Sequence, residues 1–367
     1  MSSPHGDVDS VEPPVLIRRE GHAAYVVLNR PKAINALTHE MVGIIRSALE
    51  EWADDDEVRT VVLTGAGERG LCAGGDIVAL WRDAKAGGTE AAEFWADEYR
   101  LNNLVKHYPK PYVAVMDGIV LGGGIGLSAH GSIRVVTERS SIGMPETGIG
   151  FLPDVGGTWL LSRAPGETGT HLALTAGSVK AGDALAIGMA DHFVPSERLP
   201  ALLDALATKD AREAVVAVSD PAPPSSLVAA RTWIDAAYAG DDVAVILDRL
   251  RARPEEDAQK AAGKVAAKSP TSLAVTLHAL REGARYKDLA EALDTEYRLA
   301  LRFHAHPDFV EGIRAQVVEK DRNPQWHPTS VGEVGPDDVA AFFAPLGDAE
   351  LGLAASLTGT TASTDKE

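Results

Sequence analysis

The chain has 367 residues, of which 45% are hydrophobic and 24% are charged, so it has enough material for one large domain or for a domain with a substantial extension. Its net charge of −18 argues against binding to nucleic acid or to an anionic membrane, because both attract clustered Lys and Arg side chains. The single cysteine, Cys72, the polar N-terminus and the lack of an apolar run long enough to cross a bilayer predict a cytoplasmic protein without disulfides.

The first predicted elements are a β-hairpin and an amphipathic helix. Residues 1–14 are polar and acidic, which predicts a disordered leader. Residues 15–19 and 24–28 read as two strands joined by a turn at Gly21. Thr38 resembles a helix N-cap, because the residues after it place apolar side chains on one helical face: Met41, Ile44, Ile45, Leu49 and Trp52.

The next segments alternate between apolar strands, glycine turns and helices. Strands are predicted over residues 58–64 and 111–116, and helices around 77–81 and 94–106. Repeated units of this kind predict an α/β architecture whose active groups gather at the strand ends.

The pattern becomes helical beyond Arg163. Residues 220–226 are rich in proline and serine and read as a boundary, which divides the chain into a core at 15–220 and a helical region at 221–350. Helices are predicted over 273–282, with Ser269 and Pro270 at the start, and over 289–304. Residues 351–367 are poor in apolar side chains and predict a disordered tail.

Two glycine turns and two carboxylates form the most informative pattern in the chain. Ala73-Gly74-Gly75-Asp76 and Gly122-Gly123-Gly124 each follow an apolar strand, so both turns can present backbone N–H groups to one developing oxyanion. Glu146 and Asp154 lie eight residues apart in apolar, glycine-rich surroundings. Carboxylates in such surroundings lose solvation, which raises their pKa and marks a candidate site for acyl chemistry.

Four motifs in order are similar to those of the crotonase or enoyl-CoA hydratase/isomerase superfamily: LNRPKAINALT, LCAGGDI, DGIVLGGGIG and MPETGIGFLPDVGG. The later runs SPTSLAVTLHALREG and EYRLALRFHAHPDFVEGIRAQVVEKDRNPQW resemble the C-terminal region of its 3-hydroxyisobutyryl-CoA hydrolase branch. Together these segments cover most of residues 15–345, so the resemblance does not depend on one glycine turn.

This resemblance implies a crotonase-like ββα spiral core with a helical C-terminal extension, and an acyl-CoA substrate. By motif position, the backbone N–H groups of Gly75 and Gly123 form the oxyanion hole. Hydratases of the superfamily use two glutamates. Glu146 matches the second of these positions, whereas Gly126 stands at the first. Asp154 appears where hydratases have a glycine. The combination implies hydrolysis of a short, branched 3-hydroxyacyl-CoA, with 3-hydroxyisobutyryl-CoA of valine breakdown as the expected substrate.

Glu146 and Asp154 are the expected catalytic residues. Glu146 acts at the thioester carbonyl, either as a nucleophile that forms an acyl anhydride or as a general base that activates water. Asp154 orients the substrate hydroxyl or the attacking water.

Five residues are expected to bind the substrate. Glu98 matches an acidic position of the family near the acyl group, and Ala73 lies in the first glycine turn. Arg30 and Lys32 lie where they can meet CoA phosphates, and Asp76 follows the first glycine turn. For Asp76 we favour the structural role of a cap on the following helix.

Two other functions stay open from the sequence. One is an enoyl-CoA hydratase or isomerase on the same scaffold, and the other is an acyl-CoA binder without catalysis. We expect no cofactor, because CoA is part of the substrate, and no metal, because the histidines show no ligand spacing. The sequence leaves open whether copies of the chain form a homo-oligomer.

Overall fold

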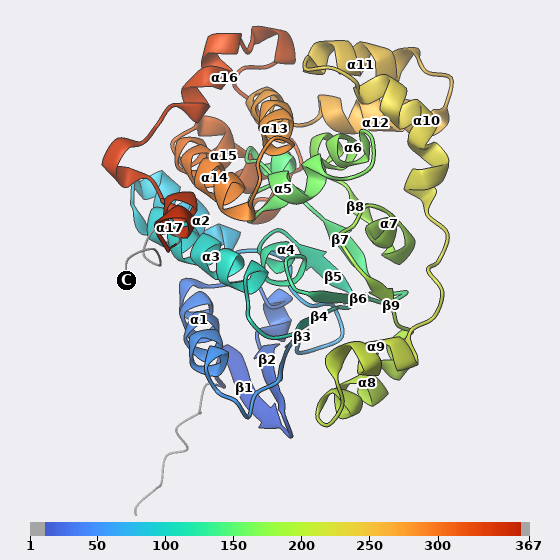
Figure 1. The fold of residues 1–367 in the computed structure, drawn as a ribbon. Coiled ribbons are helices and arrows are strands. Elements are labelled where there is room, and N and C mark those ends of the chain that lie inside the picture. The colour runs from blue at the N-terminus through green and yellow to red at the C-terminus, as the bar shows by residue number, and fades with distance from the viewer. Residues whose placement is uncertain (1–11, 361–367) are drawn as a thin grey trace, which may run out of the picture.

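The computed structural model describes residues 12–360, so most of the expected leader and residues 361–367 of the expected tail lie outside the described part of the chain. Two sheets form its centre (Figure 1). The first contains β1 (Val15–Glu20), β2 (Ala23–Leu28), β3 (Thr60–Gly65), β4 (Tyr112–Met116), β6 (Ile133–Val136) and β9 (His192–Phe193), in that spatial order. The second contains β5 (Ile119–Leu121), β7 (Ser141–Gly143) and β8 (Ser178–Val179).

Helices surround these sheets, and the first nine α-helices lie before residue 220. They are α1 (His39–Ala53), α2 (Ile77–Ala86), α3 (Glu90–Lys106), α4 (Gly123–Ser128), α5 (Gly157–Ser162), α6 (Thr168–Thr175), α7 (Ala181–Ala186), α8 (Leu199–Leu206) and α9 (Ala211–Val218). Short helical turns include η1 (Pro31–Ala33), η2 (Glu146–Ile149) and η3 (Ser196–Arg198).

The C-terminal region is helical. It contains α10 (Ser226–Tyr238), α11 (Val243–Ala252), α12 (Glu256–Ala266), α13 (Pro270–Gly283), α14 (Leu289–His304), α15 (Pro307–Ile313), η4 (Arg314–Val318), η5 (Val331–Glu333), α16 (Pro336–Phe343), η6 (Gly347–Ala349) and α17 (Leu353–Thr360). The start predicted at Ser269 is confirmed, because the Ser269 side chain accepts from the Ser272 N–H and caps α13.

The predicted hairpin is confirmed: β1 pairs with β2 in antiparallel register, with Glu20 opposite Ala23. The remaining ladders of the first sheet, from β2 to β9, are parallel. Thr38 caps α1 as expected, since its Oγ1 accepts from the Met41 N–H at 3.3 Å. The α/β class predicted from the alternating segments is therefore confirmed.

Three successive turns of the chain repeat one unit, in which a strand of the first sheet leads to a strand-like segment of the second layer and then to a helix. The second-layer segments are in register, because Cys72 lies opposite Val120 and Val120 lies opposite Ile142, both in parallel pairing. Three residues beyond these partners come Gly75, Gly123 and Pro145. The spiral thus brings both glycine turns and Glu146 to one edge.

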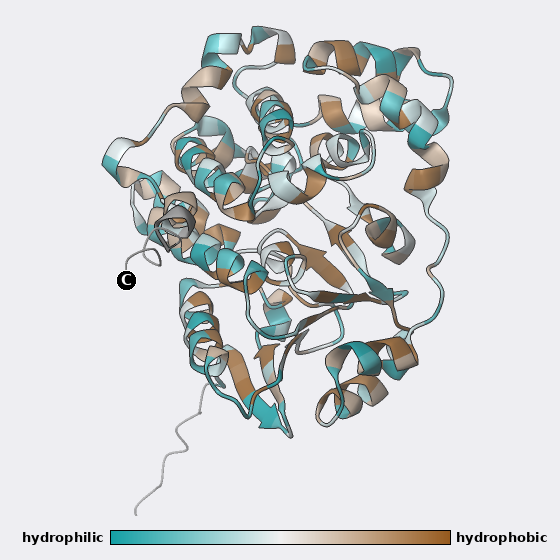
Figure 2. Cartoon of the chain, in the orientation of Figure 1, coloured by the Kyte–Doolittle hydropathy of each residue, from teal (hydrophilic) through white to brown (hydrophobic). Residues whose placement is uncertain are grey.

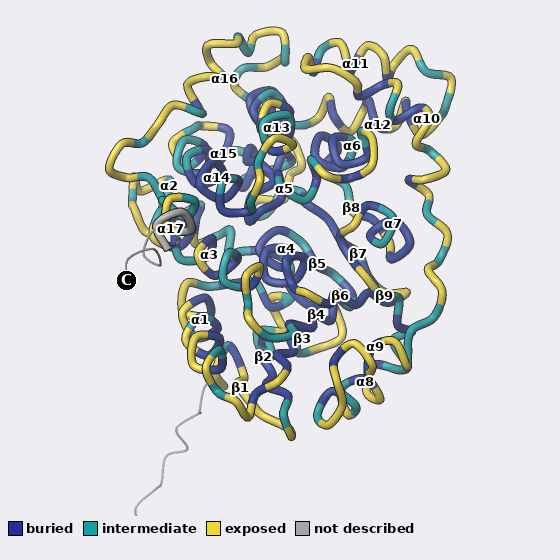
Figure 3. Tube along the Cα trace, viewed as in Figure 1, coloured by how far each residue is buried: buried dark blue, intermediate teal, exposed yellow. Residues whose placement is uncertain are grey.

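Alternation along the strands divides the apolar residues between two clusters, since successive side chains of a strand point to opposite faces. Tyr25, Val62 and Val113 pack on one face against α8 and α9, whereas the other face packs against α1 and α3 in the main cluster. Figure 2 shows the central strands as hydrophobic, and Figure 3 shows them as buried. The outer helix α16 is largely exposed, with Phe342 as its buried residue.

The main apolar cluster continues into the C-terminal helices, which contribute Leu273, Leu293 and Phe303 among others. Within residues 12–360, no helix is both long and apolar enough to cross a membrane.

One expectation for the C-terminus was wrong within the described residues. Residues 353–360 form α17, whereas the sequence predicted disorder from residue 351. The reason lies in α14, where the Asp294 carboxylate accepts from the Leu353 N–H at 2.8 Å and from the Ala354 N–H at 3.0 Å. A carboxylate that accepts the first N–H groups of a helix stabilises its start, and this cap comes from a distant part of the chain.

Candidate active site

A cavity of about 170 Å³ lies where the three spiral turns meet. It is lined by both glycine turns, by three carboxylates and by apolar side chains: Ala73, Gly74, Gly75, Ile77, Leu80, Phe94, Trp95, Glu98, Gly122, Gly123, Pro145, Glu146, Ile149, Phe151, Asp154, Val155 and Val317. The structure therefore brings together six of the residues expected from the sequence, namely Ala73, Gly75, Glu98, Gly123, Glu146 and Asp154.

The two glycine N–H groups lie close to each other. A Cβ placed on Gly123 would be 3.4 Å from the Gly75 nitrogen. Within residues 12–360, neither the Gly75 N–H nor the Gly123 N–H has a hydrogen-bond acceptor. Gly123 opens α4, where the first N–H groups of a helix have no partner inside it. The pair can therefore donate two hydrogen bonds to one oxygen atom in the cavity.

Glu146 faces this pair of donors from the third spiral turn. It is 6% exposed, and its Oε2 has no hydrogen-bond partner among the described residues. Burial raises its pKa well above the ordinary value, and the nearby charge of Asp154 adds to the shift. Gly122, with φ of +47°, leaves room for the carboxylate, because a Cβ there would lie 2.8 Å from Glu146 Oε1.

Asp154 is held in the cavity by a hydrogen bond of 2.7 Å from the Tyr99 hydroxyl to its Oδ2. The residue is 6% exposed. Burial raises its pKa to about 7, although the hydrogen bond from Tyr99 favours the ionised form. Asp154 is thus a carboxyl group that changes its charge near neutral pH.

Glu98 is the third carboxyl group, and it is 2% exposed. Its Oε1 would lie 2.5 Å from a Cβ placed on Gly123, and this oxygen has no hydrogen-bond partner in the described chain. Burial raises its pKa well above the ordinary value, followed by the effect of the Asp154 charge. A protonated Glu98 next to the oxyanion donors is able to donate a hydrogen bond.

The position of the missing hydratase acid is closed by packing. A Cβ on Gly126 would lie 2.7 Å from Asn102 Nδ2 and 2.7 Å from the Val155 Cβ. Asn102 is fully buried, so the space that a side chain at position 126 needs is already filled. Glu146 therefore has no second acid opposite it at this position.

The remaining expected binding residues lie outside this cavity. Asp76 is the N-cap position of α2, but its side chain makes no cap hydrogen bond, so the expected capping role was wrong. Its carboxylate instead accepts from Arg30 Nη2 at 3.2 Å, and Arg30 Nη1 donates to the Ala36 carbonyl at 2.5 Å. The cation of Arg30 is close enough to attract the carboxylate away from the helix end.

Arg30 and Lys32 line a surface pocket of about 780 Å³ near the start of α1. Arg30 is held by Asp76 and Ala36, whereas the Lys32 ammonium makes no ion pair with any described side chain. Lys32 is therefore the cation of this pair that is free to meet a phosphate.

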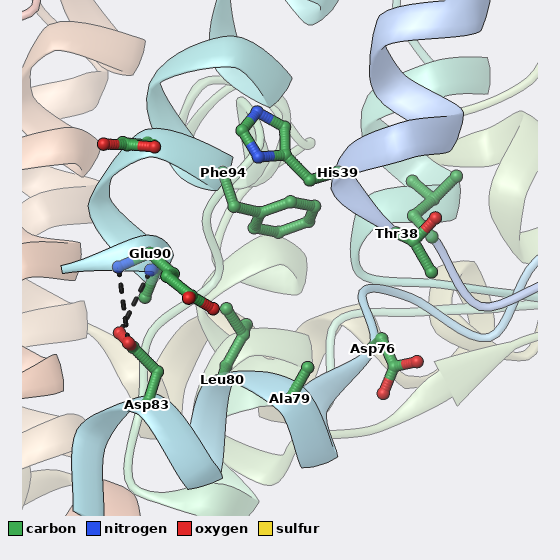
Figure 4. Close-up of a pocket in the computed structure, with 11 residues that line it drawn as sticks. Thr38, His39, Asp76, Ala79, Leu80, Asp83, Glu90 and Phe94 are labelled. Atoms are coloured by element: carbon green, nitrogen blue, oxygen red, sulfur yellow. Dashed lines mark hydrogen bonds between the residues drawn. The ribbon is translucent and has the colours of Figure 1, made fainter. Parts of the chain in front are cut away.

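A second cavity, of about 320 Å³, adjoins the first through Leu80 and Phe94, which line both (Figure 4). In Figure 4 the Phe94 ring lies between His39 of α1 and Leu80 of α2. The Asp83 carboxylate on its floor accepts from the Glu90 and Ala91 N–H groups of α3. Several carboxylates line this cavity, so it is electrostatically unsuited to phosphates.

Three residues that support or line the site were not identified from the sequence. Tyr99 holds Asp154, Val317 of η4 forms part of the cavity wall, and Glu296 of α14 binds the turn that follows Asp154. The sequence pattern does mark Glu296, because it is a carboxylate on the apolar face of a predicted helix, where Leu293 and Ala300 are also buried. The described residues contain no group of three or more His, Cys, Asp or Glu side chains arranged to hold a metal ion.

The sequence is similar to a known family and to named relatives. A family model described as enoyl-CoA hydratase/isomerase matches residues 23–343. A relative from Xenopus tropicalis, named 3-hydroxyisobutyryl-CoA hydrolase, mitochondrial, is 40% identical over 349 residues, which cover 92% of this chain and 90% of the relative.

Two solved structures are similar over nearly the whole fold. A structure titled carnitinyl-CoA dehydratase, from Mycobacterium thermoresistibile, is 50% identical, has a TM-score of 0.90, and covers 92% of this chain and 98% of its own. A structure titled enoyl-CoA hydratase, from Rhodobacter sphaeroides, is 42% identical with a TM-score of 0.88, and the match covers 92% of this chain and 99% of its own. The names of these relatives include both a hydrolase and lyases.

Proposed function

The chain belongs to the enoyl-CoA hydratase/isomerase family, and from this premise we propose that it hydrolyses short, branched 3-hydroxyacyl-CoA thioesters, with 3-hydroxyisobutyryl-CoA as its substrate. The name of the Xenopus tropicalis relative supports this substrate. The observation that carries the reaction class is Glu146, which shares a small cavity with two free backbone N–H groups, while packing closes position 126, where hydratases carry their other glutamate.

In the proposed reaction, the thioester oxygen accepts hydrogen bonds from the Gly75 and Gly123 N–H groups. These donors polarise the carbonyl and stabilise the negative charge of the tetrahedral intermediate. Each such donor contributes roughly 3 to 4 kcal/mol to transition-state stabilisation in comparable sites. Both donors belong to the backbone, so no side chain has to move to stabilise the oxyanion.

Glu146 acts on the carbonyl carbon in one of two ways. As a nucleophile, its carboxylate attacks the carbon, the C–S bond breaks, CoA leaves as a thiolate that takes up a proton, and water then hydrolyses the acyl anhydride. As a general base, Glu146 takes a proton from the attacking water, and the C–S bond breaks from the same tetrahedral intermediate. Both routes give the free acid and CoA. The raised pKa of Glu146 makes its ionised form a stronger base than a solvated carboxylate.

Asp154 and Glu98 orient the acyl group in this proposal. Asp154, anchored by Tyr99, accepts a hydrogen bond from the substrate 3-hydroxyl or from the attacking water. Glu98 Oε1 lies next to Gly123, and in its protonated form Glu98 donates a hydrogen bond to the acyl part of the substrate. Ala73, which lines the same cavity, contacts the substrate near the thioester.

The CoA part of the substrate needs a local basic surface, because the chain as a whole carries a net charge of −18. We assign Lys32 to the CoA phosphates, since its ammonium is free and lies in the surface pocket next to η1. Arg30 and Asp76 contribute indirectly, because their ion pair fixes the loop that carries Lys32.

The reaction fits a step of valine breakdown, and it requires water as the only co-substrate. The Xenopus tropicalis relative is named as mitochondrial, so the cytoplasmic location stays a prediction.

The experiment that tests the function is a panel of acyl-CoA thioesters assayed for release of free thiol. The panel contains 3-hydroxyisobutyryl-CoA, 3-hydroxybutyryl-CoA, butyryl-CoA and carnitinyl-CoA, the last chosen because one of the similar structures bears that name. We expect the highest kcat/KM with 3-hydroxyisobutyryl-CoA. The absence of thiol release from every member, with CoA still bound, would identify the protein as a binder without catalysis and overturn the proposal.

A further inference from the structure

The turn that follows Asp154 has a strained backbone. Val155 has a φ of +51°, a conformation that β-branched residues rarely adopt. Strain of this kind persists only where the surrounding structure holds it, and it concentrates at functional sites. The Gly157 N–H donates to the Asp154 carbonyl at 2.6 Å, so the turn folds tightly at this point.

Glu296 of α14 holds this turn from the C-terminal region. Its Oε2 accepts from the Gly156 N–H at 2.6 Å, and its Oε1 accepts from the Thr158 N–H at 2.9 Å and the Thr158 hydroxyl at 2.5 Å. The side chain is fully buried and does not line the active-site cavity. A buried carboxylate is stable only when its oxygens accept hydrogen bonds, and here each oxygen does so.

Tyr297, the next residue of α14, supports Asp154 indirectly, through its contact with Tyr99. The Tyr297 ring packs edge-on against the Tyr99 ring, with centroids 6.4 Å apart, and Tyr99 donates the hydrogen bond to Asp154. On the other side of the turn, His130 Nε2 lies 2.8 Å from the Val155 carbonyl oxygen. Two consecutive residues of α14 thus support the backbone and the side-chain partner of Asp154.

We propose that Glu296 is a positioning residue for the hydrolysis, which holds the 154–158 turn in its strained form and thereby keeps the Asp154 carboxyl group in the cavity. This inference rests on the proposed function, in which Asp154 orients the substrate hydroxyl or the water. It assigns part of the active-site geometry to the helical C-terminal region rather than to the spiral core. Glu296 touches no reacting atom itself.

Asp294 offers a matched control on the same helix. It lies two residues before Glu296, is 9% exposed, and also accepts two backbone N–H groups, but these belong to α17. A substitution of either carboxylate by its amide removes an acceptor oxygen from a pair of backbone N–H groups. Only the change at Glu296 releases the turn that carries Asp154.

The first test compares Glu296→Gln with Asp294→Asn. An amide replaces one acceptor oxygen by an NH₂ donor, which then faces the N–H or O–H donors of the turn. We expect kcat for thiol release to fall by about 10- to 100-fold in Glu296→Gln with KM changed less than about threefold, because misplacement of a catalytic group by about 1 Å has this effect. In Asp294→Asn, kcat stays within about twofold of the wild type. Equal losses in the two variants would contradict the proposal.

A double-mutant cycle separates positioning from general stability. In the Asp154→Asn background, measured by single turnover with excess enzyme, Glu296→Gln should lower the rate by less than about twofold further, because the group that it positions is already lost. A full additional loss in that background would show that Glu296 acts on folding alone and would overturn the inference. If Glu296→Gln does not fold, Thr158→Val replaces it in the cycle, since it removes one of the three donors.

Amide hydrogen exchange tests the contact independently of catalysis. In Glu296→Gln, exchange at Gly156 and Thr158 should accelerate by at least about tenfold, whereas in Asp294→Asn the acceleration should fall on Leu353 and Ala354. Unchanged exchange at Gly156 and Thr158 would contradict the proposal even in an active enzyme. Accelerated exchange in a protein that hydrolyses no thioester would instead refute the proposed function and leave the contact established.

Discussion

The spiral core and the helical C-terminal region contribute to the cavity in different ways. The core provides every polar group that meets the acyl thioester in the proposed reaction: Gly75, Glu98, Gly123, Glu146 and Asp154. The C-terminal region provides a wall, through Val317, and a support, through Glu296. Gly75, Gly123 and Glu146 follow segments that are in register, whereas Glu98 lies on α3 and Asp154 lies in the turn before α5. The supporting groups of the C-terminal region sit on helical segments that pack over the core.

This difference shows how a fold can keep the arrangement of its reacting groups while the wall of the cavity, and with it the preferred substrate, changes. The register of the spiral fixes the distance between the two N–H donors and Glu146, so substitutions in the core should alter the rate constant. Helices packed on that core can change the wall of the cavity without moving the donors. Mutations in the two regions should therefore affect different kinetic parameters.

The largest effect is expected at Glu146, a reacting group of the spiral core. Glu146→Gln keeps the shape of the side chain but removes the nucleophile or base, so kcat for thiol release should fall by at least about 10³-fold. Calorimetric titration with CoA should give an affinity within about threefold of the wild type, because the change lies at the thioester rather than at the phosphates. Turnover near the wild-type rate would remove Glu146 from the mechanism.

The oxyanion donors give the next largest effect. In Gly123→Ala, the new methyl group would lie 2.5 Å from Glu98 Oε1 and 3.0 Å from Leu37 Cδ1, so it would displace these side chains and fill space next to the Gly75 nitrogen, which would be 3.4 Å away. We expect kcat to fall by about 10²- to 10³-fold. Gly43→Ala is the matched control, because nothing lies within 4 Å of a Cβ at this position in α1. Equal activity of the two variants would contradict the assignment of the oxyanion hole.

The buried carboxyl groups of the core make stability depend on pH. The folded-state pKa of Asp154 is raised to about 7, so the folded chain binds this proton more tightly than the unfolded chain, and the contribution is lost as pH rises from about 4 to 7. Asp154→Asn removes this loss. Its free energy of unfolding should therefore increase relative to the wild type, by on the order of a few kcal/mol between pH 4 and pH 8, in urea titrations. A difference that is independent of pH would contradict the raised pKa.

The smallest effect is expected in the wall of the C-terminal region. Val317→Ala enlarges the cavity by two methyl groups, which should shift the ratio of kcat/KM values for a longer and a branched acyl-CoA by about tenfold in favour of the longer one. The rate constant for the best substrate should change little, because no donor or acid moves. A large loss of kcat with all substrates would break the division of roles between the two regions.

The sequence allowed prediction of most of the polar groups that the fold brings into one cavity, for a physical reason. Glu146 and Asp154 stand out because a carboxylate in apolar, glycine-rich sequence loses solvation, and the two glycine turns stand out because each follows an apolar strand. The choice of Gly75 and Gly123 within these turns came from the resemblance to the crotonase superfamily. The start of α13 at Ser269 and the bounds of α14 followed from capping and helical spacing. These signals are local, so they are readable without a fold.

The interactions that the sequence did not predict join distant segments. The partner of Asp76 is Arg30, 46 residues away, and the cap of α17 is Asp294, about 60 residues away. The contact between Glu296 and Gly156 spans 140 residues. Each of these depends on how helices and loops pack in three dimensions, which neither capping rules nor periodicity describe.

The central claim is that Glu146 and two backbone N–H donors act on the thioester carbonyl to hydrolyse it, in a cavity where packing leaves no room for an acid at position 126. The most direct measurement compares cleavage of the thioester C–S bond with hydration of a C=C bond. The wild-type enzyme is mixed with 3-hydroxyisobutyryl-CoA and with the corresponding unsaturated acyl-CoA, and the products are identified by mass spectrometry. The account predicts 3-hydroxyisobutyrate and free CoA from the first substrate, at a rate at least about 100-fold above any hydration of the second. Rapid interconversion of the two thioesters without release of CoA would contradict it.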